Sequence, residues 1–465
     1  MATGYYDDLN KKSEASGTIS SLKGLRQVNP MPDNMGGNTE YAYILTMEYT
    51  HIKDQATYVD LTGGLREFSI YNKFDDGKFS IISASLVVNK IQLKDIHNLF
   101  RSMTIYISMK MFKNKADGAK YYGEEFEPVW NRKKFRIIQN SNMALPPEVN
   151  ADDKTSDSSR IENYPVTLTL ISEDILNIYK ENFNGVFRDV MLKDIIYYLI
   201  GGTKVDVKLY AQAPKSTDTF KQLIIPAGDI FDVLTFLDNY YGIYEGKGLF
   251  FADVDKLIIM DKLTPYLSPT AKINKVEITL FQAAGASGLD TGNSYVNEKQ
   301  KKLQLFIEDS PKVKVNDIIN RMKYGNDIAI LNSNGKTITS TANAGITKDV
   351  YDGYDKKTYF WCNSSSNLLT DALKVDFNKD AECLEIVVSS TVYSMITPEY
   401  KYEVKANYDA ASGFEGTYRL AKVFHKFTRA NGGQITMLSN GAKNEKVESK
   451  NTKFMLMTSL SLKHI

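Results

Sequence analysis

Thiols, signal segments and long apolar runs are scarce or missing in this chain of 465 residues. Its two cysteines, Cys362 and Cys383, cannot build a disulfide framework or a four-thiolate zinc site, so they fit a reducing compartment. The longest uninterrupted apolar run, residues 195–200, is far shorter than the roughly 20 residues that cross a bilayer. The N-terminus lacks the apolar stretch of a secretory signal peptide. We therefore expect a protein that is soluble as synthesised and does not bind membranes.

Net charge is nearly absent as well. The chain has 57 Lys and Arg against 56 Asp and Glu, a net charge of +1, whereas polyanion-binding proteins are normally strongly basic. This balance argues against a polyanion-binding protein but does not exclude a local basic patch. The chain is instead rich in tyrosine (29) and phenylalanine (22), with only 12 prolines. This composition favours a β-rich chain, and an assembly protein with large interfaces remains a second interpretation.

Histidine, the commonest catalytic and metal-binding side chain, occurs four times. The positions are His51, His97, His425 and His464. None has a histidine or cysteine partner at the spacing that metal sites use. His425 lies in a segment with a strand pattern, so we expect it to be packed or hydrogen-bonded there.

Other chemical motifs are incomplete. The segment Gly242–Gly248 resembles a phosphate-binding loop, but no Ser or Thr follows Lys247, so a hairpin turn is the better interpretation. The segment Asp376–Asp380 resembles a calcium loop but has Ala381 where glycine is required. Carboxylates such as Glu124 cannot be paired from sequence, and no Gly-x-Ser-x-Gly motif is present. We expect no catalytic, cofactor-binding or metal-binding residues, and no enzyme.

Residues 1–39 are polar, so we expect an arm that is ordered only when a partner holds it. From Tyr41 to Thr50 the residues alternate in polarity, which predicts a strand. Further strands are expected at 68–71, 79–88, 103–111, 135–139 and 166–171. Several short strands at this spacing indicate that residues 40–171 form a first β-barrel, with a solvated loop at 146–163.

The period changes to 3.6 in residues 172–268, which predict an α/β middle domain. One helical face contains Phe187, Met191, Ile195, Tyr198 and Leu199, and the helix is expected to end at Gly201-Gly202. A second helix is predicted from Asp229, a good N-cap, to Gly242. Its apolar face contains Ile230, Val233, Leu234, Leu237 and Tyr241. A hairpin of 243–245 with 249–252 and a strand at 257–260 follow.

Residues 269–440 predict a second barrel, interrupted at about 283–382. Its strands are expected at 276–281, 384–392, 400–405, 417–428 and 434–438. Within the interruption, residues 283–297 look like a mobile loop and 315–323 like a short helix. Residues 441–465 predict a basic, flexible tail with an apolar patch at 454–457. The fold class is α+β, mainly β: two β-barrel-like tube domains, an intervening α/β domain, and an inserted segment in the second barrel.

Two stretches resemble the baseplate hub proteins of contractile-tailed bacteriophages. One comprises residues 229–244 (DIFDVLTFLDNYYGIY), 248–253 (GLFFAD) and 257–261 (LIIMD), an amphipathic helix, a Tyr-Gly turn and an aromatic hairpin. The other comprises 400–405 (YKYEVK), 416–427 (GTYRLAKVFHKF) and 434–440 (QITMLSN), which is similar to the last strands of that family's second barrel. The resemblance covers residues 172–265 and 384–440, and the strands of 41–171 fit the first barrel in place and type.

The resemblance implies a function that follows from geometry. Hub proteins of this family form a threefold ring in which each chain contributes two similar barrels, so six barrels match a sixfold tail tube above and a threefold spike below. This implies a structural component of the virion's tail baseplate, a homotrimer that lines the DNA conduit and has no cofactor. The implied partners are other copies of the chain, the central spike, the tail tube and baseplate wedge proteins. Tape measure protein and DNA would contact the lumen, where a near-zero net charge avoids a strong grip on phosphates.

Two alternatives stay open. The same ring could serve a bacterial contractile injection or type VI-like secretion system. A chain of another class, a carbohydrate-binding or carbohydrate-cleaving β-protein, would use exposed aromatic residues to stack on sugars. The arm 1–39, the stretch 283–382 and the basic tail depart from the compact pattern of the hub family.

Overall fold

The computed structural model describes most of the N-terminal half of the chain and separate stretches of the C-terminal half. The described residues are 39–51, 54–75, 77–117, 120–140, 163–203, 207–214, 216–244, 248–254, 256–262, 275–282, 294–297, 301–307, 312–315, 327–332, 337–341, 357–362, 382–389, 392–406, 414–429 and 453–464. Residues 1–38 of the predicted arm 1–39, residues 146–162 of the predicted loop 146–163, and the predicted strand 434–438 lie outside these ranges. No helix in the described ranges is long and apolar enough to cross a membrane.

The N-terminal part is mostly β-strand, as its alternating pattern predicts. In β1 the side chains of Tyr41, Tyr43, Leu45, Met47 and Tyr49 are all buried. The elements are β1 (Thr39–His51), β2 (Asp54–Asp60), η2 (Thr62–Gly64), β3 (Leu65–Lys73), β4 (Ile81–Val88), α2 (Lys90–Leu99), η3 (Phe100–Ser102), β5 (Met103–Asp117), β6 (Lys120–Asn140) and β7 (Tyr164–Ser172).

The middle part, residues 172–261, combines three helices with two small sheets. Strands β8 and β10 form an antiparallel ribbon, and β11, β12 and β9 form a three-stranded sheet. The elements are α4 (Glu173–Lys180), β8 (Phe183–Met191), α5 (Leu192–Gly202), β9 (Lys208–Ala211), β10 (Thr219–Gly228), α6 (Ile230–Tyr241), β11 (Gly248–Asp253) and β12 (Lys256–Asp261). We call these residues the middle segment.

The C-terminal part returns to strands. Three of them, β17, β18 and β19, form a separate sheet. The elements are β13 (Lys275–Gln282), β14 (Ser294–Asn297), β15 (Lys302–Ile307), β16 (Lys312–Val315), β17 (Asp327–Asn332), β18 (Thr337–Thr341), β19 (Lys357–Cys362), β20 (Glu382–Ser389), η5 (Tyr393–Met395), β21 (Lys401–Ala406), β22 (Gly416–Arg429) and β23 (Lys453–His464).

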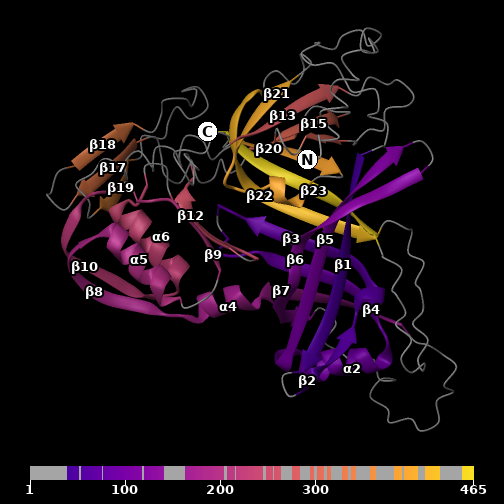
Figure 1. The fold of residues 1–465 in the computed structure, drawn as a ribbon. Coiled ribbons are helices and arrows are strands. Elements are labelled where there is room, and N and C mark those ends of the chain that lie inside the picture. Colours follow the sequence, from indigo (N-terminus) through magenta and orange to yellow (C-terminus); the bar gives the residue numbers. More distant parts are fainter. Residues whose placement is uncertain are drawn as a thin grey trace.

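Eight strands close into a barrel, so the predicted class, α+β and mainly β, is confirmed. Hydrogen-bonded neighbours run in the order β22-β3-β4-β7-β6-β5-β1-β23, and β23 pairs with β22 to complete the circle. Figure 1 shows the orange and yellow strands β22 and β23 lying across the indigo strands from the N-terminal part. The barrel predicted from residues 40–171 alone is therefore incomplete, because two of its strands come from the far end of the chain.

The strands β22 and β23 also belong to a second sheet, and we call them the shared strands. A path of eight strands runs β14-β15-β13-β21-β22-β23-β20-β16 through the described residues. The first residues of β22 pair with β21, and its later residues pair with β3. A register irregularity between Leu420 and Lys422 separates these two parts of the strand. The two halves of the chain therefore share one pair of strands and do not form two separate barrels.

The flexible tail predicted at 441–465 is wrong for its last residues. Residues 453–464 form β23, which pairs with β1, β20 and β22. The supposed apolar patch is the start of that strand, with Phe454 and Leu456 buried in the core. Lys453 and Lys463 lie near the two ends of this strand, and together with the lysines before it they give the segment the composition of a basic tail.

The predictions for the middle segment are confirmed in one helix and corrected elsewhere. Helix α6 begins after Asp229, whose Oδ1 accepts hydrogen bonds from the amides of Phe231 and Asp232, and it ends at Gly242 with a φ of 71°. The helix predicted from Phe187 starts only at Leu192, because the preceding residues form β8. The hairpin is β11 with β12 rather than 243–245 with 249–252.

The interruption 283–382 contains strands that the sequence pattern did not predict. Strand β14 lies within the predicted mobile loop, and β15 to β19 follow in the next hundred residues. The short helix predicted at 315–323 falls outside the described residues except for Val315, which ends β16.

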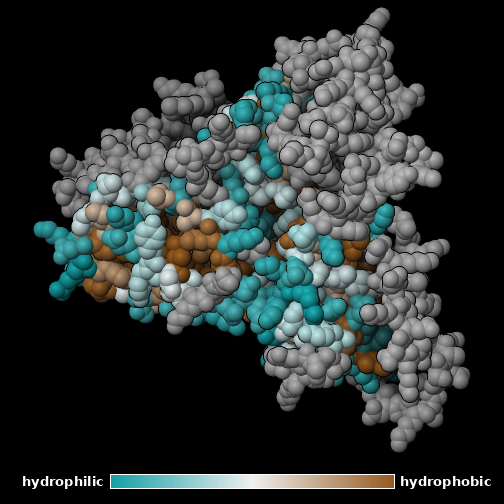
Figure 2. Space-filling model, viewed as in Figure 1, coloured by the Kyte–Doolittle hydropathy of each residue, from teal (hydrophilic) through white to brown (hydrophobic). Residues whose placement is uncertain are grey.

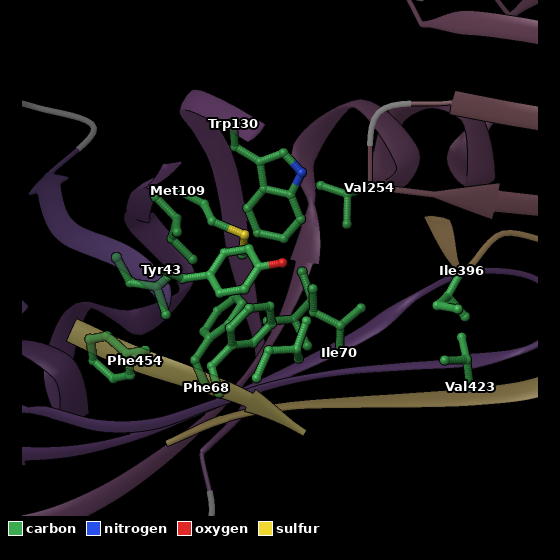
Figure 3. Packing of buried hydrophobic residues seen from close by; sticks show 14 of the residues in the cluster. Tyr43, Phe68, Ile70, Met109, Trp130, Val254, Ile396, Val423 and Phe454 are labelled. Carbon is green, nitrogen blue, oxygen red and sulfur yellow. The ribbon is translucent and has the colours of Figure 1, made fainter. Parts of the chain in front are cut away.

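Two hydrophobic cores meet at the β11–β12 hairpin. Phe251 and Met260 face the core inside the barrel, whereas Phe250 and Ile259 face the core under the helices of the middle segment. Figure 3 shows the barrel core, where Trp130, Tyr43 and Phe68 cluster with residues of the shared strands. Since one hairpin is buried by both cores, the middle segment and the barrel are joined by packing.

Candidate functional site

The interior of the barrel is filled by aromatic side chains. Tyr43 meets Phe427 edge to face at 5.1 Å between ring centroids, and Trp130 meets Tyr393 at 6.0 Å. The short helix η5 inserts Tyr393 from the β20–β21 connection, and its amide donates a 2.9 Å hydrogen bond to the hydroxyl of Tyr43. A small barrel filled in this way is a packed core and no channel.

His425 is buried on the inner face of β22, as the sequence predicts. Its Nδ1 lies 2.9 Å from the hydroxyl of Thr458 on β23, and its ring lies 4.8 Å from that of Tyr393. Burial lowers the pKa of His425 to about 3, because the charged imidazolium would lose its hydration. The side chain therefore stays neutral and acts in packing the shared strands.

Asp75 joins three parts of the fold at one buried point. It follows β3 and forms ion pairs with Arg419 of β22, with Lys463 of β23 at 2.6 Å, and with Lys262, directly after β12, at 3.7 Å. Burial alone would raise the pKa of Asp75, but these three cations outweigh it and hold the pKa well below its usual range. The carboxylate therefore ties the barrel to the middle segment and to both shared strands.

The loop after Asp75 docks on the middle segment through further polar contacts. The ammonium of Lys78 lies 2.8 Å from Asp229 and 2.6 Å from Asp232, at the start of α6. The hydroxyl of Ser80 donates a 2.8 Å hydrogen bond to Asp253 at the end of β11. These contacts join the loop to the start of α6 and to the end of β11.

A further ion pair links the middle segment to the second sheet. Lys256 of β12 lies 3.0 Å from Glu399 in the connection before β21, and both side chains are largely buried. Burial would lower the pKa of Lys256, but Asp253 and Glu399 outweigh it and raise the pKa. Sequence reasoning missed the ion pairs of Asp75 and the Lys256–Glu399 pair, because each of them joins residues more than a hundred positions apart.

The other residues considered in the sequence are scattered. The structure places His51 in β1, His97 in α2 and His464 in β23, whereas Cys362 and Cys383 lie in strands of different sheets. Residues 376–380 lie outside the described residues. Within the described ranges, no group of three or more His, Cys, Asp or Glu is arranged to hold a metal ion.

Exposed apolar side chains gather on the middle segment. Of the fourteen large hydrophobic side chains that are exposed in the described residues, seven belong to this segment. They are Tyr179, Val186, Tyr197, Tyr198, Leu209, Ile224 and Tyr240. Figure 2 shows hydrophobic surface over the region that α5 and α6 occupy in Figure 1. The middle segment therefore exposes more large apolar side chains than any other part of the chain that the structure describes.

Comparison with protein families identifies the chain. The model for the bacteriophage PBS1 gene 109 protein matches residues 41–465, which include the barrel, the middle segment and the second sheet. The chain belongs to this family. The resemblance to phage proteins noted in the sequence is thereby confirmed. A search of curated proteins found no match for the sequence.

Solved structures with a similar chain path have little sequence in common with this family member. A tail protein from Neisseria meningitidis is 8% identical, with a TM-score of 0.48 over 91% of this chain and 96% of that one. The 43 kDa tail protein of prophage MuSo2 from Shewanella oneidensis is 8% identical, with a TM-score of 0.45 over 90% and 96%. A chain of the Francisella PdpA–VgrG complex is 10% identical, with a TM-score of 0.42 over 98% and 62%.

Proposed function

We propose that this phage protein is a structural, non-catalytic component of the tail baseplate. In this proposal three copies form a ring that adapts a sixfold tail tube to a threefold central spike and surrounds the path of the DNA. The observation that carries the proposal is the pair of eight-stranded paths fused through β22 and β23, in a chain that belongs to a phage family.

Symmetry explains why such a chain suits an adaptor. Each copy offers two β units, the closed barrel and the second sheet, so three copies offer six units to a sixfold partner. A closed ring of identical chains requires heterologous interfaces, in which one face of a copy meets a different face of the next. Because the barrel interior is filled, DNA would pass along the axis between copies and not through any single barrel.

The middle segment would provide contacts outside this axis. Its exposed tyrosines and aliphatic residues are the types that protein interfaces favour, and they stand on a segment held by Asp75 and Lys256. In the proposal this segment meets other copies or neighbouring baseplate proteins, such as the wedge proteins. The tape measure protein and the spike would meet the ends of the ring.

Particles produced without this gene test the proposal. We expect heads and no complete tails by electron microscopy, because the tube would lack its platform. In wild-type particles, antibody against the chain is expected at the end of the tail distal to the head, and quantitative mass spectrometry is expected to give three copies per tail. Infectious particles lacking the chain, or antibody bound to the head, would refute the tail role.

The same particles separate the phage role from a secretion role. If the chain belongs to an injection system without a head, antibody would label tubes that carry no DNA-filled head. Labelling of headed particles supports the phage assignment.

A further inference from the structure

The closed barrel is held together unequally around its circle. Six of its strands, in the order β3-β4-β7-β6-β5-β1, are hydrogen-bonded neighbours and all lie within residues 39–172. The shared strands β22 and β23 fill the gap between β3 and β1 and complete the circle. We call the pairing of β22 with β3 the β3 seam and the pairing of β23 with β1 the β1 seam.

The β1 seam is the shortest of the barrel's seams in the described residues. It consists of three pairs, in which residues 42–44 stand opposite residues 455–453. The seam ends before Met47, because other partners occupy the same edge of β1 from there on. The amide of Met47 donates a 2.9 Å hydrogen bond to the hydroxyl of Thr62, and its carbonyl accepts one from the amide of Leu61. Few backbone bonds therefore close the barrel at β1.

The β3 seam is longer and is reinforced beyond its strands. Residues 422–428 of β22 stand opposite residues 73–67 of β3, which gives seven pairs. At one end of the seam, the amide of Phe74 donates a 2.9 Å hydrogen bond to the carbonyl of Ala421. Asp75, the next residue, forms its buried ion pairs with both shared strands. Backbone pairing and charge therefore hold the shared strands more firmly to β3 than to β1.

The shared strands form a paired unit without β1. Eleven residue pairs join them to each other, while β21 pairs with the first residues of β22 and β20 pairs with the later residues of β23. The buried side chains of His425 and Thr458 stand opposite each other on the two shared strands and lie 2.9 Å apart, between Nδ1 and Oγ1. This polar pair is satisfied within the shared strands, so it stays satisfied when they separate from β1.

Packing in the barrel interior keeps the β1 seam closed. Phe454 is buried beside the seam, and the ring of Tyr43 meets that of Phe427 edge to face at 5.1 Å. The hydroxyl of Tyr43 also accepts a hydrogen bond from the amide of Tyr393. Contacts of this kind are lost after small separations, so they break together and the seam is either closed or open.

We propose that the β1 seam is a latch. The barrel opens there while the shared strands stay joined to β3 and to the second sheet, so the β3 seam acts as the hinge. Opening exposes the edge of β1 and the buried rings of Tyr43 and Phe454, and this open form is the one that proteases and other strands reach. The latch belongs to a single copy, so it does not depend on the proposed ring.

Disulfide bonds across two different seams test the latch in the full-length chain. The latch variant combines Ile44→Cys with Lys453→Cys, because these residues stand directly opposite each other in the β1 seam. The control variant combines Ser85→Cys with Thr167→Cys, which stand directly opposite each other on β4 and β7. Opposite residues of antiparallel strands have Cα atoms about 4.5–5.5 Å apart, a separation that a disulfide spans.

The rate of unfolding in denaturant is measured for each variant with its disulfide oxidised and reduced. Both variants also carry Cys362→Ser and Cys383→Ser, so that no other thiol competes. If the latch opens before the rate-limiting step, the oxidised latch variant should unfold at least about tenfold more slowly than its reduced form. The control bond joins strands that are still paired at that step, so it should slow unfolding by about twofold or less. The rate is measured because the two bonds close chain loops of different length, which alters the unfolded state.

Several results would overturn the latch. These are an unfolding rate that the latch disulfide leaves unchanged, an effect of the control disulfide that equals or exceeds it, and a folded latch variant whose thiols do not oxidise. Thermal melting of the reduced forms checks their fold against the wild type. If the reduced latch variant melts early, Ala42→Cys with Met455→Cys replaces it, because these residues are also directly opposite in the β1 seam.

Discussion

The closed barrel and the middle segment use apolar residues in opposite ways. In the barrel, the apolar residues of β1 point inward, and Tyr393 fills the interior from the β20–β21 connection. In the middle segment, Tyr197 and Val186 stay more than half exposed although a core lies beneath them. The comparison shows that the alternation of β1 buries its apolar side chains in one core, whereas the middle segment covers a core and still leaves large apolar side chains exposed.

Yet the two regions are not independent. The β11–β12 hairpin is buried by both cores, and Asp75 contacts the middle segment and both shared strands. The middle segment is therefore joined to the barrel by apolar packing and by ion pairs. The following changes separate what each region contributes, beginning with the largest expected effect.

Removal of residues 453–465 deletes β23. We expect the chain to lose cooperative unfolding and to aggregate, because β1, β20 and β22 would each lose a hydrogen-bonded neighbour and expose an edge. Near-ultraviolet circular dichroism and thermal melting measure the effect. Adding a peptide of residues 453–465 should restore part of the signal, and a truncated chain that melts like the wild type would contradict the closed barrel.

Leu234→Asp places a charge on the buried face of α6. We expect the free energy of unfolding to fall by about 3–5 kcal/mol, since an unpaired buried charge is costly and a large apolar side chain is lost. Tyr240→Asp on the same helix is the control, because Tyr240 is 42% exposed. Denaturant unfolding of both variants measures the difference. Unchanged melting of Leu234→Asp would show that the helical face is wrongly assigned.

Asp75→Asn leaves Arg419, Lys463 and Lys262 without their shared carboxylate. We expect a loss of about 3 kcal/mol, because removing one partner of a buried ion pair leaves uncompensated charge. The pKa of Asp75 is depressed in the folded chain, so its contribution is present above its unfolded pKa and is lost as the pH falls below about 4. The exposed Asp189→Asn variant serves as the control. Equal stability of the two variants at neutral pH would contradict the role of Asp75.

At neutral pH His425 gives the smallest effect, because its contribution appears only as a slope of stability against pH in acid. The folded chain keeps His425 neutral down to a pKa of about 3, whereas the unfolded chain binds a proton below about 6.5. Stability should therefore fall by about 1.4 kcal/mol per pH unit between these values as the pH is lowered. His425→Gln should remove this part of the slope, and His97→Gln on α2 should keep it. Identical pH profiles of the two variants would contradict the buried, neutral state of His425.

Local patterns predicted the elements whose causes are local. Asp229, the apolar spacing after it and Gly242 define α6 within fifteen residues, and the structure confirms each of them. The alternation from Tyr41 likewise predicted β1. The stretches that resemble hub proteins, residues 229–261 and 400–440, are likewise short local strings.

Features that depend on distant partners could not be predicted. Nothing in residues 453–464 reveals that they close a barrel with β1, because that pairing joins residues about four hundred positions apart. In the sequence Asp75 has no feature that marks it out from other loop aspartates. Its partners Arg419 and Lys463 become apparent only when β22 and β23 are placed beside it. Val387 and Ile81 likewise come into one row only through the register of the strands between them.

The shared strands belong to both the closed barrel and the second sheet, so their pairing is the most important feature to measure. Amide hydrogen exchange of the full-length chain, followed by mass spectrometry of peptides, reports it directly. If β23 closes the barrel, amides of residues 454–462 exchange as slowly as those of β1 and the barrel-facing part of β22. Exchange of residues 454–462 at the rate of an unstructured peptide would contradict the closed barrel and the sharing of these strands.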